Sequence, residues 1–156
     1  EPRLTQDLDC IVAVSPAEVL SLLDGLQADG FAVERSRVLQ QVESMGTFSV
    51  KRGDWRVDMI LVSTGFEQSA FQRAQRFRLY EIEANFPTPE DLILLKLVPG
   101  RDKDLLDAKT VMLRHSHQLD RPYLEQWAQR LSDEAEDARI WHTLQRLFQE
   151  VNARSE

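Results

Sequence analysis

Residues 5–14 read TQDLDCIVAV, so two aspartates flank one leucine and an apolar run follows them. If Leu8 to Val14 forms a buried strand, its side chains alternate between two faces, and Asp7 and Asp9 share one face at its beginning. Two carboxylates held that close repel each other unless a cation joins them. Magnesium suits such a pair because it prefers hard oxygen ligands and also binds phosphate oxygens. The alternative is an acidic strand end exposed to solvent.

A second apolar segment, WRVDMILV at residues 55–62, contains a single acid. Asp58 stands between two apolar residues, where burying an unpaired carboxylate would be costly. If this segment and the first are neighbouring strands, Asp58 joins Asp7 and Asp9 in a three-carboxylate metal site. Such a site suits metal-assisted phosphoryl or nucleotidyl transfer.

Three segments together resemble the minimal nucleotidyltransferases of the polymerase-beta superfamily. They are PRLT followed by DLD within residues 2–9, RVD at 56–58 and PEDLILLKL at 89–97. The sequence is more similar still to bacterial proteins related to the abortive-infection nucleotidyltransferase toxins, and the similarity runs from about residue 1 to residue 131. The resemblance implies a toxin–antitoxin component that acts in the bacterial cytoplasm.

The resemblance also implies a reaction, the transfer of a nucleotide from a nucleoside triphosphate to an acceptor. Asp7 and Asp9 would hold two Mg²⁺ ions, and Asp58 would complete the second metal site. The metals would bind the triphosphate and activate an acceptor hydroxyl, and pyrophosphate would leave in an in-line displacement. The acceptor stays open between RNA, a protein side chain and a small molecule.

Four further residues are candidates for binding the substrate. In the family, a lysine placed like Lys96 faces the nucleotide phosphates, Arg101 steadies them, and an aspartate placed like Asp104 orients both cations. The alternatives are a lysine that extends to solvent and an aspartate that stabilises the positive end of a helix. Arg73 lies close to two more arginines, which suits a basic lip for phosphate or RNA. These arginines can equally be solvated and offset nearby acids.

The family pattern has a Gly-Gly or Gly-Ser turn before the first acids, which holds the triphosphate. Six residues without a glycine precede Asp7, so we expect the family's first strand and helix to be missing. Two principal hypotheses follow: an enzyme, or a non-catalytic module that keeps the fold and binds a partner protein or forms a homodimer. A metal-dependent phosphohydrolase is a third, but the sequence has no His-Asp metal motif to support it.

Composition limits the class of protein. A chain of 156 residues with 42% hydrophobic and 29% charged residues suits one soluble domain with a sizeable core. A net charge of −7 disfavours nonspecific nucleic-acid binding. The single cysteine, Cys10, excludes an internal disulfide and a thiol-based zinc cluster, which fits a reducing cytoplasm. We find no segment long and apolar enough to span a membrane.

The overall pattern predicts one α+β domain over residues 1–156, with a small mixed sheet in 1–86 and a helical part in 87–156. In the first part, Ser15 and Pro16 would begin a helix, Ser36 would cap a second that stops at Gly46, and residues 52–54 would form a hairpin turn. A short helix over 66–74 and one strand over 77–84 would follow.

The helical part begins with a capping signal. Thr88 is the expected N-cap, with Pro89 at the first helical position and Asp91 as the capping-box partner. Asp120 is expected to cap a later helix. Residues 89–131 are therefore predicted to be helical and to pack against the sheet, and a last amphipathic helix is expected over residues 140–151.

Overall fold

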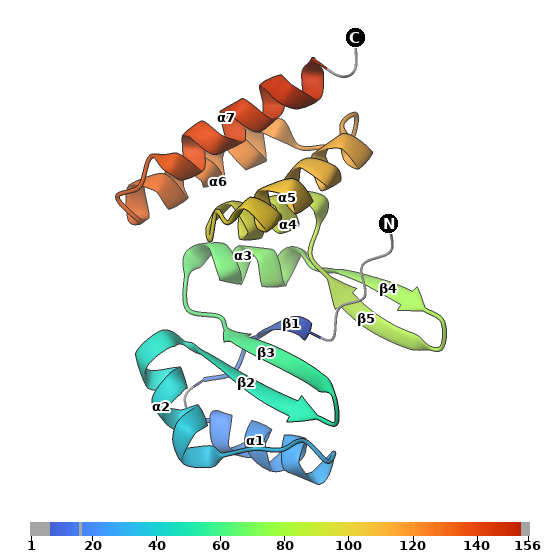
Figure 1. Cartoon of the computed structure of the whole chain (residues 1–156), viewed down its shortest axis with the longest axis vertical. Helices are drawn as coiled ribbons and strands as arrows, with labels where there is room; N and C mark the ends of the chain where they lie inside the picture. Colours follow the sequence, from blue (N-terminus) through green and yellow to red (C-terminus); the bar gives the residue numbers. More distant parts are fainter. Residues whose placement is uncertain (1–6, 16, 154–156) are drawn as a thin grey trace. The chain divides into compact units, whose positions relative to one another are not determined.

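The computed structural model describes residues 7–15 and 17–153, and its fold is the predicted α+β (Figure 1). Two compact units, residues 1–71 and 72–156, are described separately below. The first contains β1 (Asp7–Val12), α1 (Val19–Ala28), α2 (Arg35–Met45), β2 (Thr47–Arg52) and β3 (Trp55–Leu61). Helix α3 (Gly65–Arg73) crosses the boundary between the units. The expectations for Pro16 and for residues 2–5 lie outside the described residues.

Strand β3 is the middle strand of the sheet in the first unit. It pairs in parallel with β1 and antiparallel with β2. The register places Asp9 opposite Asp58 and Asp7 opposite Arg56 on the β1 side. On the other side it places Ser49 opposite Asp58. The predicted adjacency of the two acid-bearing strands is therefore confirmed, and so is the hairpin turn at residues 52–54.

The two faces of this sheet have opposite character because side chains alternate along each strand. One face carries the buried core residues Phe48, Val50, Val57, Met59 and Leu61, which pack with Val19 and Leu23 of α1 and Val38 of α2. Figure 1 shows α1 and α2 on one side of the sheet. The residues between these positions, Asp58 among them, belong to the opposite face. Burial of the apolar face thus turns the acids away from the core.

The first two helices do not begin with the predicted caps. Helix α1 begins at Val19 after Glu18 and has no side-chain cap hydrogen bond, so the predicted cap at Ser15 is wrong. The Glu18 carboxylate accepts hydrogen bonds from the Ser15 backbone N–H at 2.8 Å and the Ser15 hydroxyl at 2.7 Å, ahead of α1. The predicted Ser36 cap is wrong, because the extended Glu34 caps α2 and its carboxylate accepts from the Arg37 N–H. Ser36 lies inside the helix and donates to Glu34 instead. Gly46 ends α2 as predicted, with a φ of 66°.

The single strand predicted over residues 77–84 is wrong. The segment forms a hairpin of β4 (Gln75–Leu79) and β5 (Ile82–Phe86), and Tyr80 has a φ of 55° in the turn. Residues 80 and 81 form the turn. Apolar residues that a single strand would divide between its two faces therefore all lie on one face of the hairpin. They are Phe77, Leu79, Ile82, Ala84 and Phe86. The first two and Ile82 are at least half exposed rather than packed on a core.

The second unit continues with α4 (Pro89–Leu97), α5 (Asp102–His115), α6 (Arg121–Glu134) and α7 (Arg139–Asn152). Thr88 and Asp120 are N-caps as predicted, since their side chains accept from the backbone N–H three residues later. The core of the helices includes the fully buried Ile93, Leu94, Met112, Leu124 and Leu144. The helical prediction for residues 89–131 is confirmed, and their packing against the sheet stays a prediction. No helix in the described part of the chain combines the length and apolar character needed to cross a membrane.

The helical core provides a first test. Replacing the fully buried Leu144 by alanine should lower the free energy of unfolding by about 2–5 kcal/mol, through lost burial and a cavity. The same replacement at Leu106, which is 65% exposed, should change it by less than about 0.5 kcal/mol. Urea denaturation followed by circular dichroism measures both, and equal losses would show that the assigned core is wrong.

Candidate functional site

The predicted acids of the first unit lie on neighbouring strands. Asp9 of β1 and Asp58 of β3 are register partners, and partners in a parallel pair point to the same face of a sheet. Asp9 is exposed, and the Asp58 side chain is 30% exposed. Asp7 is the register partner of Arg56, but its side chain lies outside the described structure. The structure therefore brings Asp9 and Asp58 together on the face that points away from the core.

Asp58 has two close partners on its own face of the sheet. Its Oδ1 accepts a hydrogen bond from the Ser49 hydroxyl on β2 and another from Arg56 Nε at 2.8 Å. Arg56 Nη2 also donates to Ser49 Oγ at 3.0 Å, which closes a triangle of polar contacts. These contacts explain how an acid is accommodated in an apolar strand, since the carboxylate is both turned from the core and neutralised.

The donor chemistry of this face fits a divalent metal. Two carboxylates in register offer hard oxygen ligands, which Mg²⁺ prefers. Among the side chains that the structure describes, no three histidine, cysteine or acidic groups are gathered as a metal site would need. The side chain of Asp7, the third predicted ligand, is not among those described. The described side chains therefore include two of the three predicted ligands, and the metal site stays a prediction.

A second cluster lies where α4 ends and α5 begins. Gly100, with a φ of 61°, allows the chain to turn between the two helices. Lys96 Nζ lies 3.4 Å from Asp104 Oδ1, and Arg101 Nε donates to Asp104 Oδ2 at 2.5 Å. Lys96 Nζ is also 3.8 Å from a carboxylate oxygen of Asp107. The grouping of Lys96, Arg101 and Asp104 predicted from the sequence is thus present in the structure.

Asp104 is the centre of this cluster because it is almost completely buried. Burial alone would raise the pKa of Asp104, but the hydrogen bonds and charges of Arg101 and then Lys96 outweigh it and lower the pKa below its ordinary value. The carboxylate is therefore ionised at neutral pH. One buried anion holds two cations, one on each of its oxygens.

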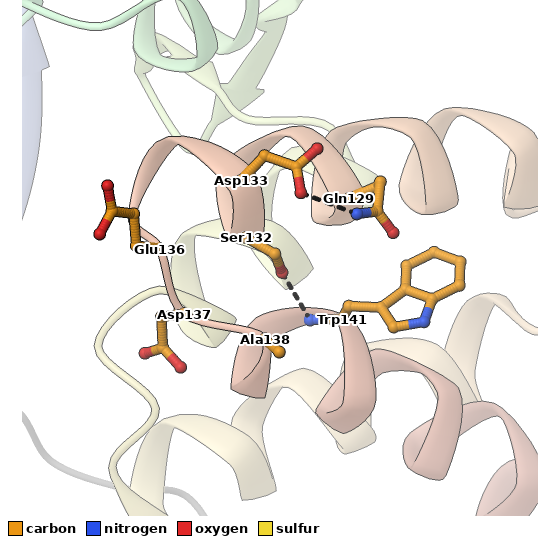
Figure 2. Close-up of a pocket in the computed structure, with 7 residues that line it drawn as sticks. All are labelled: Gln129, Ser132, Asp133, Glu136, Asp137, Ala138 and Trp141. Atoms are coloured by element: carbon orange, nitrogen blue, oxygen red, sulfur yellow. Dashed lines mark hydrogen bonds between the residues drawn. The ribbon is translucent and has the colours of Figure 1, made fainter.

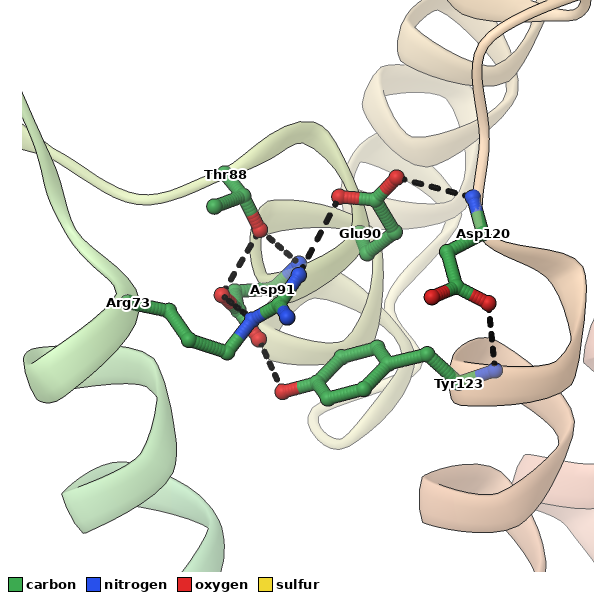
Figure 3. A network of polar contacts seen from close by, with 6 residues as sticks. All are labelled: Arg73, Thr88, Glu90, Asp91, Asp120 and Tyr123. Carbon is green, nitrogen blue, oxygen red and sulfur yellow. Dashed lines mark hydrogen bonds and ion pairs between the residues drawn. The ribbon is translucent and has the colours of Figure 1, made fainter.

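Arg73 is placed in a different network (Figure 3). Its Nε donates to Asp91 Oδ2 at 3.1 Å, one of its terminal nitrogens is 3.6 Å from Glu90, and its guanidinium lies 3.9 Å from the centre of the Tyr123 ring. Arg76 and Arg78 are likewise paired, with Glu83 and Glu81 of the hairpin. These pairs favour the alternative of arginines that offset nearby acids, and the phosphate-binding role of Arg73 stays a prediction.

Asp91 has a larger role than its sequence position indicated. It is fully buried, and its carboxylate accepts from the Thr88 hydroxyl at 2.7 Å and the Tyr123 hydroxyl at 2.6 Å, besides Arg73. Figure 3 shows these side chains converging on Asp91 from α4, α6 and the end of α3. The TPED signal identified the capping contact but not the partners, since Tyr123 is 32 residues away.

A surface pocket of about 400 Å³ lies at the turn between α6 and α7 (Figure 2). It is lined by Gln129, Ser132, Asp133, Glu136, Asp137, Ala138 and Trp141. Ser132 Oγ accepts from the Trp141 backbone N–H at 3.0 Å, so it joins the two helices. Hydrogen bonds from Arg139 lower the pKa of Asp137. None of the predicted site residues lines this pocket, and its polar contacts are those of a helix–helix turn.

A family model described as "Nucleotidyltransferase of unknown function (DUF6036)" matches residues 2–156. The chain belongs to this family. The predicted relation to nucleotidyltransferases is thereby confirmed, and a nucleotide is the substrate that the family description implies. No curated protein matches the sequence.

The Asp91 network provides a second test. Replacing Tyr123 by phenylalanine keeps the ring over Arg73 but removes the hydroxyl donor from a fully buried carboxylate. We expect a loss of about 1–3 kcal/mol in the free energy of unfolding. The same change at Tyr80, which is 95% exposed, should have an effect within about 0.5 kcal/mol. Indistinguishable denaturation curves for the two variants would contradict the role given to the hydroxyl.

Asp104 provides a test by pH. Because its pKa is lowered in the folded chain, its stabilising contribution is fully present above the ordinary value of 3.8 and is lost as pH falls through the lowered value. Asp104→Asn should therefore be less stable than the unchanged protein at pH 7, and the gap should narrow below about pH 4. Urea denaturation at a series of pH values measures the gap. Asp102→Asn, at an exposed position of the same helix, is the control. A gap that stays constant down to pH 3 would contradict the assignment.

Proposed function

We propose that this protein is a Mg²⁺-dependent nucleotidyltransferase that transfers a nucleotide from a nucleoside triphosphate to an acceptor. One observation carries the proposal: Asp9 and Asp58 are register partners on the face of the sheet that points away from the core. The family of the chain supports the same class of reaction. Carboxylates placed in this way are available to a cation without disturbing the packed face.

The predicted site residues have two proposed roles. Asp9 and Asp58, with Asp7, would hold the metal, which supplies charge neutralisation for the phosphate oxygens. In the second unit, Lys96 and Arg101 would bind phosphate oxygens. Asp104 would orient them, since it contacts both cations and is buried. Orientation by a buried anion reduces the side-chain entropy that each cation would otherwise lose on binding.

The acceptor and the biological setting belong to the proposal as well. RNA, a protein side chain and a small molecule are the three acceptor classes, and a toxin–antitoxin role fits transfer to the first two. The net charge of −7 weighs against loose binding of any RNA, so an RNA acceptor would need specific contacts.

A non-catalytic module that binds a partner is the second candidate. One observation favours it, namely that Asp58 Oδ1 is already engaged by Arg56 and Ser49. A label-transfer assay separates the two candidates. The protein is incubated with Mg²⁺, each nucleoside triphosphate labelled at the α-phosphate, and either total RNA or total protein. Transfer that is lost in Asp9→Asn but kept in Asp29→Asn, an exposed acid elsewhere in the unit, supports the enzyme. Transfer by both variants would reject the role given to Asp9, and the absence of transfer by all three proteins would favour the module.

Magnesium binding can be tested apart from catalysis. A ligand that binds the folded chain stabilises it by RT ln(1 + [L]/Kd), about 2.7 kcal/mol at one hundred times Kd. We expect Mg²⁺ to raise the temperature of thermal unfolding, and Asp9→Asn to weaken that response, because an amide is a poorer ligand for a hard cation. The measurement is repeated with ATP. An equal response to Mg²⁺ in both proteins would mean that the acids are only a solvated strand end.

A further inference from the structure

Four register positions on β1 and β3 form a small charged array. Asp7 is opposite Arg56, and Asp9 is opposite Asp58. Among the described side chains, Asp9, Arg56 and Asp58 belong to this array, on strands whose other face is the core of the unit. The arginine is attached to an acid of its own strand, since Arg56 Nε donates to Asp58 Oδ1 at 2.8 Å.

We propose that Arg56 is a resident counter-cation, which neutralises Asp58 until a divalent cation displaces it. This inference rests on the proposed function, because it concerns the same carboxylates. Asp58 Oδ1 accepts from Arg56 and from Ser49, so one of the two carboxylate oxygens is occupied by donors. A dication and a guanidinium on one carboxylate repel each other, and the two cations therefore compete for Asp58.

Exposure makes the exchange feasible. The side chains of Arg56 and Asp58 are 49% and 30% exposed, and ion pairs this accessible to water contribute little to stability. The arginine is long enough to keep its charged end in water after it leaves the acid. The Arg101–Asp104 pair of the second unit is the contrast, because Asp104 is only 1% exposed and cannot lose its partner without leaving a buried charge.

Competition between Arg56 and the metal for Asp58 determines how metal affinity changes when Arg56 is removed. Removing Arg56 should tighten metal binding, because the metal no longer has to displace a cation from Asp58. If Arg56 instead held Asp58 in the orientation that a metal needs, its removal would weaken metal binding. The two roles therefore predict opposite changes in metal affinity when Arg56 is replaced.

The test uses Mn²⁺ as a probe, because free Mn²⁺ is counted directly by its electron paramagnetic resonance signal and no turnover is needed. Arg56→Gln should lower the Kd for Mn²⁺ by about threefold or more, the scale of one exposed ion pair. Lys51→Gln is the matched control, since Lys51 is the register partner of Arg56 on β2 and is exposed. It removes the same charge from the same face, and should change the Kd by less than about twofold. Arg56→Lys, which keeps the charge but loses the fixed fork of donors, should fall between the unchanged protein and Arg56→Gln.

A second readout follows the arginine itself. The ¹H–¹⁵N signal of an arginine Nε–H group that is missing in Arg56→Gln identifies Arg56. Adding Mg²⁺ should shift that signal in the unchanged protein and leave it in place in Asp58→Asn. A signal that does not respond to saturating Mg²⁺ would overturn the displacement.

The outcomes separate this inference from the proposed function. Equal or weaker Mn²⁺ binding by Arg56→Gln, equal tightening by Lys51→Gln, or no Mn²⁺ binding by any of these proteins would overturn the counter-cation. Tighter binding by Arg56→Gln together with no label transfer would support the counter-cation and reject the enzyme. Label transfer with unchanged Mn²⁺ affinity in Arg56→Gln would support the enzyme and reject the counter-cation.

Discussion

The register of β1 on β3 is the constraint on which the first unit depends. A shift of one residue would move every side chain of β1 to the other face, exposing Cys10 and Val12 and turning Asp9 toward α1 and α2. The same register therefore both buries the apolar side chains and places the acids on the opposite face. The packing of the core fixes the face on which the carboxylates lie, and the contacts of Asp58 with Ser49 and Arg56 form on that face.

Buried and exposed carboxylates play different parts in this chain. Asp91 and Asp104 are almost completely buried, and each is held by at least two donors, as a buried charge must be. Loss of one of those donors would leave the buried carboxylate with fewer hydrogen bonds than it has in the folded chain, at a cost in stability. Asp9 and Asp58 keep contact with water and can change partners at small cost. Exposure, rather than charge alone, distinguishes acids that hold the fold together from acids that can bind a ligand.

Local patterns predicted much of this arrangement. Apolar runs identified β1 and β3, and the Thr88 and Asp120 caps identified α4 and α6, because both kinds of signal lie within a few residues of sequence. The hairpin was missed because its apolar residues change from odd to even positions at Tyr80, which alternation along one strand cannot reveal. The contacts of Asp91 with Arg73 and Tyr123 were missed because they join residues 18 and 32 positions apart. The pairing of Arg56 with Asp58 was within reach, since residues two apart on a strand share a face.

In the proposed function, the buried anion of the Lys96 cluster would prepare a site for another anion. One oxygen of Asp104 contacts Lys96 and the other contacts Arg101. An ammonium has three N–H donors and a guanidinium has five, so both cations keep further donors for a ligand. The three groups together carry one net positive charge. Asp107, 44% exposed and 3.8 Å from Lys96, reduces that charge to zero. A phosphate would therefore compete with Asp107 for Lys96 but not with Asp104, whose burial keeps it in place. The accessible acid, not the buried one, then limits how strongly this cluster can bind an anion.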